Sequence, residues 1–375
     1  MKILRYNNTI LIMGEFGLLD FVKQGSIWRR LQEETRPIVL YGMGDGALKI
    51  MAACQKYGIG IRGIFASDEY VRGHSFEGYP VKRLAQVEEE FDDFIVLLCF
   101  AAFTPELLQK IFALHQRHEV LAPDVPVFGD ELFDEAYFKT HESELEESYS
   151  LLADEFSKRV FENVLNFKLS GKIDLLRDIE TPKDEVYRQI LHLGTEEHYL
   201  DLGGYDGDTV LEFLEQTGGK YGSVTVLEPD VKNFRKLTKT AKQYGWEDML
   251  LLNKGVWSED SILSFDNRAG RNSFLSSSGR TTVPVCSVDS LLQDKPCTFI
   301  KMDVEGAERE VLLGAKATLR MKRPKLAFSG YHRSEDLFAL PLLLNKIEPS
   351  YQIFLRHHPY LPAWETNFYA VADKI

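Results

Sequence analysis

The sequence predicts an α/β protein whose 375 residues form two domains, each built on a parallel β-sheet. Two stretches, 37–54 and 199–214, repeat the same order of apolar strand, glycine-rich turn and helix. Further apolar strands alternate with helical segments after each of these stretches. Because strands that alternate with helices form parallel sheets with right-handed crossovers, both domains are expected to be Rossmann-like.

The predicted boundaries divide the chain into three parts. Residues 1–130 form the N-terminal Rossmann-like domain, 131–197 a helical connector, and 198–375 the C-terminal domain. In the connector, glycines are sparse and charged and apolar residues recur at helical spacing. In the C-terminal domain, strand-like pieces within 261–288 predict an inserted hairpin, and the last two strands are expected to form an antiparallel pair.

The glycine turn of the N-terminal domain has two interpretations. Gly42, Gly44 and Ala47 occupy the glycine positions of a nucleotide-binding turn, and Asp68 follows the next strand, where an acid can bind a ribose. The same glycines are equally compatible with a tight turn that binds nothing. The ligand of this domain therefore stays open.

Composition and charge exclude several classes of protein. A net charge of −13 argues against nonspecific binding of nucleic acid, which needs clustered Lys and Arg. No apolar run approaches the roughly 20 residues that span a bilayer, and the first residues do not resemble a signal peptide. The four cysteines are widely separated, so neither a zinc site nor a disulfide framework is expected. We expect a cytoplasmic protein that binds neither nucleic acid nor membranes.

The turn of the C-terminal domain, Y-L-D-L-G-G-Y-D-G-D-T at 199–209, carries acids and no Lys or Arg. A pyrophosphate favours helix N–H groups and basic side chains. This turn suits a cationic ligand with hydroxyl groups better, and S-adenosylmethionine is such a ligand. Glu228 ends the next strand about 20 residues later, where an acid can accept hydrogen bonds from ribose hydroxyls.

Further candidates lie at the ends of the later strands. Asp303 ends the strand T-F-I-K-M-D, with Glu305 and Glu308 just after it, and His332 follows the strand P-K-L-A-F-S. The carboxyl ends of parallel strands line one crevice, so Asp303 and His332 are predicted to be catalytic, as acceptors of a substrate proton. Glu305 and Glu308 also fit the favourable position of acids at a helix N-terminus.

Several sequence blocks in the C-terminal half resemble the FkbM family of S-adenosylmethionine-dependent methyltransferases. They are D-L-G-G-Y-D-G-D-T at 201–209, L-E-P-D at 227–230, I-K-M-D-V-E-G-A-E at 300–308, V-L-L-G-A at 311–315 and E-T-N-F-Y-A-V at 365–371. The resemblance covers most of 198–372. One departure is Y-D-G in the turn, where family members commonly have an Asn.

The resemblance implies a class I methyltransferase-type seven-stranded sheet whose last strand is antiparallel. It also implies that Asp201 meets the methionine amino group, that Glu228 binds the ribose, and that Asp303 lies near the transferred methyl group. The predicted cofactor-binding residues are Asp201, Gly203, Gly204, Tyr205, Asp206, Gly207, Thr209, Glu228 and Asn253.

The predicted function is methyl transfer from S-adenosylmethionine to a hydroxyl of a small acceptor, a sugar or a natural product, without a metal ion. Two alternatives remain. The first is a ligand-binding protein without catalysis. The second is a nucleotide-sugar oxidoreductase or epimerase that uses the N-terminal domain, although this domain lacks a Tyr-x-x-x-Lys proton relay. A homodimer is also left open.

Overall fold

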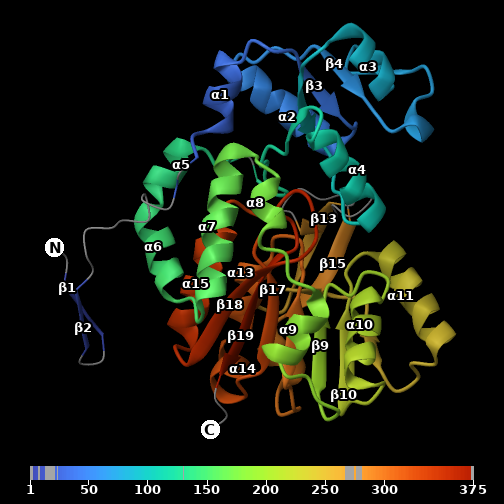
Figure 1. Cartoon of the computed structure of the whole chain (residues 1–375). Coiled ribbons are helices and arrows are strands. Elements are labelled where there is room, and N and C mark those ends of the chain that lie inside the picture. The colour runs from blue at the N-terminus through green and yellow to red at the C-terminus, as the bar shows by residue number, and fades with distance from the viewer. Residues whose placement is uncertain are drawn as a thin grey trace.

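The computed structural model describes residues 3–6, 9–12, 22, 24–129, 131–266, 274–275 and 281–372. Two large sheets, each covered by helices, confirm the predicted α/β class, and the N-terminal sheet lies above the C-terminal one in Figure 1. A separate antiparallel pair, β1 (Ile3–Tyr6) and β2 (Thr9–Ile12), precedes them. Among the described residues, no helix is both long enough and apolar enough to cross a bilayer.

The N-terminal sheet has the strand order β5-β6-β4-β3-β7-β8, and only the edge strand β5 runs antiparallel. Every residue of β3 and β7 is buried, as expected for the central strands of a sheet covered on both faces. The strands are β3 (Ile38–Tyr41), β4 (Gly63–Phe65), β5 (Ser75–Phe76), β6 (Tyr79–Lys82), β7 (Ile95–Leu98) and β8 (Glu119–Leu121). The helices are α1 (Ile27–Glu33), α2 (Asp45–Lys56), α3 (Leu84–Glu90) and α4 (Pro105–His115).

Helices of the connector pack against the C-terminal sheet and reach the N-terminal one. They are α5 (Glu135–Thr140), α6 (Glu142–Ser150), α7 (Glu155–Ser170), α8 (Asp174–Arg177) and α9 (Lys183–Gln189). Helix α7 contacts β18, and α6 contacts α15. One continuous apolar core contains Val39 and Val96 of the N-terminal sheet, Phe161 of α7, and Phe328 and Leu355 of the C-terminal sheet. The two sheets therefore share a core through α7.

The C-terminal sheet has seven strands in the order β11-β10-β9-β16-β17-β19-β18. The last strand in sequence, β19, runs antiparallel between β17 and β18, which confirms the predicted sheet. The strands are β9 (His198–Leu202), β10 (Ser223–Leu227), β11 (Leu250–Leu252), β16 (Phe299–Met302), β17 (Lys325–Ser329), β18 (Tyr351–His357) and β19 (Thr366–Ala372). The helices are α10 (Asp208–Thr217), α11 (Val231–Tyr244), α12 (Val288–Leu292), α13 (Glu308–Gly314), α14 (Lys316–Met321) and α15 (Asp336–Ile347).

The insertion before β16 forms its own small sheet, in the order β12-β15-β13-β14. Strands β13 (Ser261–Asp266) and β15 (Thr281–Cys286) pair antiparallel, which confirms the predicted hairpin. The other two strands are β12 (Gly255–Val256) and β14 (Phe274–Leu275). Most of the Ser/Gly-rich link between β13 and β15 lies outside the described residues.

Candidate active site

A cavity of about 730 Å³ lies between the carboxyl edge of the C-terminal sheet and the N-terminal domain. Its floor is formed by residues after β9, β10, β16 and β17, and one wall comes from residues 99–101, 103 and 125–127. The strand order reverses between β9 and β16, which is where ligands bind in open α/β sheets. Its volume lies within the range of about 300–1,000 Å³ for small-molecule pockets.

The glycine turn after β9 is closely packed against the turn after β16. Gly203 has a φ of +91°, and a Cβ built there would lie 2.0 Å from the carbonyl oxygen of Asp303. Only glycine combines this conformation with such close approach. Gly207, with a φ of +94°, begins helix α10. Gly203, Tyr205 and Thr209 line the cavity, whereas Gly204 and Gly207 pack behind the turn, against Val226 and Trp246 respectively.

Glu228 faces the cavity directly after β10 and is 5% exposed. Its two carboxylate oxygens accept hydrogen bonds from the backbone N–H groups of Tyr205, at 2.9 Å, and Asp230, at 2.8 Å. Burial raises the pKa of the Glu228 carboxyl to about 7, although these backbone donors favour the ionised form. The predicted ribose acid is thus fixed beside the glycine turn, with further acceptor capacity on its oxygens.

Three polar residues that were predicted to bind the cofactor do not line the cavity. Asp201 is fully buried in β9, and its Oδ2 accepts a hydrogen bond from the hydroxyl of Thr209, which lies on the cavity wall. The Nδ2 of Asn253 points inward and donates to the carbonyl oxygens of Glu228, at 2.8 Å, and Pro229, at 3.1 Å. Asp206 is not among the residues that line the cavity either. Asp201 and Asn253 hold the residues around the ligand site through these hydrogen bonds, and a direct contact of the three residues with the cofactor stays a prediction.

Asp303 lies on the cavity floor at the end of β16, as predicted. Its Oδ1 accepts hydrogen bonds from the hydroxyls of Ser329, at 3.0 Å, and Tyr331, at 3.5 Å, and its Oδ2 lies 3.4 Å from Lys301 Nζ. Burial alone would raise the pKa of this carboxyl, but Lys301 and His332 hold it at about 2. Asp303 is therefore ionised and is a weak base.

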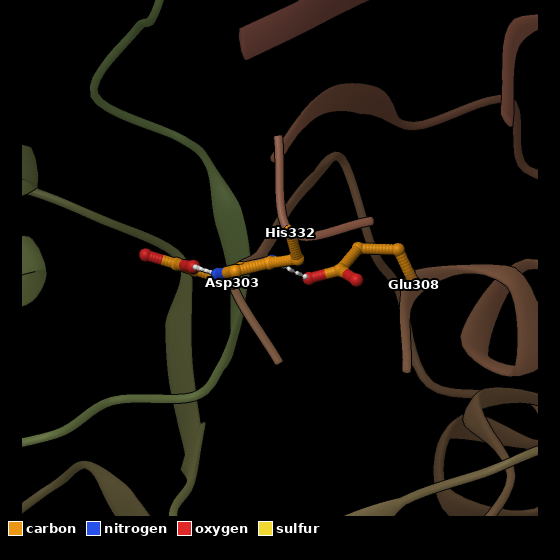
Figure 2. A group of neighbouring side chains, drawn as sticks. All are labelled: Asp303, Glu308 and His332. Atoms are coloured by element: carbon orange, nitrogen blue, oxygen red, sulfur yellow. Dashed lines mark hydrogen bonds and ion pairs between the residues drawn. The ribbon is translucent and has the colours of Figure 1, made fainter. Parts of the chain in front are cut away.

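His332 lies among three carboxylates. Figure 2 shows two of them, Asp303 and Glu308, on either side of the imidazole. Its Nδ1 is 2.9 Å from Glu308 Oε1, and its Nε2 is 3.5 Å from Asp303 Oδ1 and 3.5 Å from Glu305 Oε2. Burial alone would lower the pKa of His332, but the carboxylates raise it to about 10. The imidazole is thus protonated at neutral pH. A protonated ring cannot accept another proton, so these contacts favour a charged, orienting role for His332, and its predicted role as a base stays untested.

Glu305 has the properties that were expected of His332. It lines the cavity, and burial raises the pKa of its carboxyl to about 8, near the working range of a general base. Its φ of +54° is unusual for a residue other than glycine, and such strain is concentrated at functional sites. The sequence also places Glu305 in this cluster. An acid near a helix N-terminus is favourable without any catalytic role, so the sequence alone did not identify Glu305 as the base.

Asp303, Glu308 and His332 also form a group whose potential metal-ligand atoms lie within 4.8 Å of one another. In Figure 2, however, the imidazole lies between the two carboxylates and interacts with both. A ring nitrogen must lose its proton to bind a metal, and here the three carboxylates favour the protonated ring by raising the pKa of His332. Asp303, Glu308 and His332 therefore interact as a cluster of ion pairs. Catalysis without a metal ion stays a prediction.

Residues 201–359 match the family model of the methyltransferase FkbM domain. This part of the chain is therefore similar to the methyltransferase FkbM domain. The solved structure of methyltransferase FkbM from Methylobacillus flagellatus is similar in fold to the whole chain, with a TM-score of 0.69 and 23% identity over 93% of this chain and 94% of that one. This likeness extends beyond the FkbM domain to the N-terminal domain and the connector.

Other solved structures align with about half of the chain. A precorrin-6y C5,15-methyltransferase from Geobacter metallireducens has a TM-score of 0.34 and 10% identity over 51% of this chain and 87% of that one. An rRNA methylase from Streptococcus thermophilus has a TM-score of 0.33 and 14% identity over 52% of this chain and 95% of that one. No curated protein matches the chain.

Proposed function

We propose that this protein transfers a methyl group from S-adenosylmethionine to a hydroxyl oxygen of a small acceptor, a sugar or a natural product. The proposal is supported most by one cavity that contains both a site for a nucleoside and a cluster of charged side chains. Glu228 and the turn at Gly203 provide a site for a nucleoside, and the charged cluster of Asp303, Glu305 and His332 lies on the neighbouring strand ends.

The residues on the cavity wall fit S-adenosylmethionine. Glu228 can accept hydrogen bonds from ribose hydroxyls, and Gly203 leaves room for close approach to the backbone. Lys183 of α9 lies on the same wall, 3.4 Å from Glu212 and 3.3 Å from Glu365, so it can meet a carboxylate of the ligand. When bound, S-adenosylmethionine supplies an electrophilic methyl group on its sulfonium.

The residues near Asp303 would position and deprotonate the acceptor. A hydroxyl is a poor nucleophile, so an in-line displacement needs both orientation and a base. Ionised Glu305 accepts the proton of the reacting hydroxyl as its oxygen bonds to the methyl group, and Asp303 orients the acceptor by accepting a hydrogen bond from a neighbouring donor of the same molecule. His332, held protonated by Glu308, keeps the two reacting carboxylates close together by electrostatic attraction.

The direct test is calorimetric titration with S-adenosylhomocysteine, followed by incubation with a labelled methyl donor and a panel of glycosides and phenols. We expect micromolar binding and label on oxygen in at least one acceptor. The absence of binding at millimolar ligand would refute the assignment of the cofactor. Binding without any methyl transfer would favour the alternative of a ligand-binding protein.

A further inference from the structure

A strip of three aromatic rings crosses from one domain to the other along the cavity wall. Phe103 belongs to the N-terminal domain, and Tyr360 and Trp364 belong to the loop between β18 and β19. The rings of Phe103 and Tyr360 are stacked, with centroids 5.6 Å apart and an angle of 15° between planes. The rings of Tyr360 and Trp364 follow at 6.3 Å and 39°. The strip is therefore a stack of rings with apolar faces at its ends, and neither domain forms it alone.

Backbone hydrogen bonds between the domains fix the position of this strip. Ala102 and Leu361 form an antiparallel bridge, in which the N–H of each donates to the carbonyl oxygen of the other at 2.8 Å. Phe103 and Tyr360 directly adjoin the bridged residues. Both bridged residues are also buried, so the two rings are held at a set distance from the sheet edge.

Polar groups suited to hydroxyls border the strip. Glu365 and Asn367 follow Trp364 and line the cavity, and Lys183 Nζ lies 3.3 Å from Glu365 Oε2. The Oδ1 of Asn367 is buried and has no hydrogen-bond partner among the described residues. A buried acceptor without a partner is destabilising, so this position favours a hydrogen-bond donor beside Asn367.

We propose that the acceptor is a sugar whose ring lies on the strip of Phe103, Tyr360 and Trp364. This rests on the proposed function and assigns one residue of the acceptor site, Phe103, to the N-terminal domain. A pyranose presents C–H groups on its face and hydroxyls at its edge. The face packs on the aromatic rings, while the edge faces the side chains of Glu365 and Asn367 on the cavity wall.

The N-terminal glycine turn borders the same cavity but is not built for a phosphate. Asp45 begins helix α2, so a carboxylate lies at the end where an anion would bind. Lys49 uses its three Nζ protons on the carbonyl oxygens of Pro126 and Val127, at 3.1 and 2.8 Å, and on Asp45 Oδ2, at 3.1 Å. The turn therefore serves as a wall, which favours a sugar without a nucleotide bound to this domain.

The test is calorimetric titration of the full chain with methyl glycosides of common hexoses and deoxyhexoses, with and without saturating S-adenosylhomocysteine. Simple nucleosides and phenols form the comparison panel. The variants are Phe103→Ala and Trp364→Ala, with Phe103→Tyr as the conservative change. Tyr70→Ala is the matched control, because Tyr70 is an exposed aromatic residue of the same domain as Phe103 and is outside the cavity.

We expect at least one glycoside to bind, and each alanine variant to weaken that binding tenfold or more, while Phe103→Tyr and Tyr70→Ala stay within twofold of the wild type. Binding of S-adenosylhomocysteine should stay within twofold in all four variants. Glycoside binding that is unchanged in Phe103→Ala and Trp364→Ala, or binding of nucleosides or phenols alone, would overturn the proposal. Glycoside binding that depends on the strip, without any binding of S-adenosylhomocysteine, would refute the methyltransferase assignment and leave the sugar site standing.

Discussion

Glu228 makes the affinity for the cofactor depend on pH. Ribose hydroxyls donate hydrogen bonds, so the ionised carboxylate is the form that binds them. With a pKa of about 7 for this carboxyl, the ionised share is about one tenth at pH 6 and about nine tenths at pH 8. If only this form binds, the affinity for S-adenosylhomocysteine should rise about tenfold between these pH values.

The raised pKa of Glu228 also makes the stability of the protein without ligand depend on pH. Burial raises the pKa of Glu228 from its ordinary value of 4.5, so the ionised form is disfavoured in the folded state. The contribution of this group to stability is fully present below pH 4.5 and is lost as the pH rises through about 7, the pKa in the folded state. Ligand binding should offset that loss, so stabilisation by S-adenosylhomocysteine should be larger at pH 8 than at pH 6.

The variant Glu228→Gln removes the titrating group. Its amide nitrogen has to face the N–H of either Tyr205 or Asp230, because both present donors to the native carboxylate. Loss of hydrogen bonds to a charged group costs about 1.5–3 kcal/mol, which corresponds to roughly 10- to 150-fold weaker binding at pH 8. The remaining affinity should not change between pH 6 and pH 8.

Calorimetric titrations at pH 6, 7 and 8 would measure both effects. The control is Glu215→Gln, which removes an exposed carboxylate on α10 that is not part of the cavity wall. It should behave like the wild type. The reasoning would be refuted by a wild-type affinity that stays constant between pH 6 and 8, or by a Glu228→Gln variant that keeps the pH dependence of the wild type.

Two further predictions concern the floor of the cavity. Gly203→Ala should lower the free energy of unfolding by about 1–3 kcal/mol more than Gly218→Ala. Both positions have a positive φ, but only a Cβ at position 203 would meet a backbone oxygen. Equal losses of stability in urea unfolding would contradict this packing. Glu305→Gln should lower kcat about 100-fold or more, should abolish the rise of the rate with pH through about 8, the pKa of the Glu305 carboxyl, and should leave the affinity for S-adenosylhomocysteine within threefold. A pH–rate profile that Glu305→Gln leaves unchanged would exclude Glu305 as the base.

The sequence was sufficient to predict the elements that depend on local patterns. The glycine turn at 203–207 and the start of the following helix follow from strand periodicity and from where glycine is required. The seven-stranded sheet was implied by the resemblance to the FkbM family, and the structure confirms it. Glu228 and Asp303 were placed correctly on the cavity wall because the carboxyl ends of parallel strands meet at one edge.

Side-chain direction and protonation could not be predicted in the same way. Asn253 lies near the same edge, yet its amide points to the backbone of Pro229, a choice that depends on how two loops pack. The protonation of His332 depends on carboxylates of a separate segment, 303–308. The contact between Phe103 and Tyr360 joins two domains and has no local signature in the sequence.

The apolar core shared through α7 affects whether the protein can be divided into domains and how ligands enter the cavity. The C-terminal domain is not a detachable module, because a truncation that begins at residue 198 would remove α7 and uncover the face of β18 that it contacts. Such a fragment is expected to aggregate. The shared core also opposes wide separation of the two halves, so ligand entry should depend on local motion of the loops at the cavity mouth.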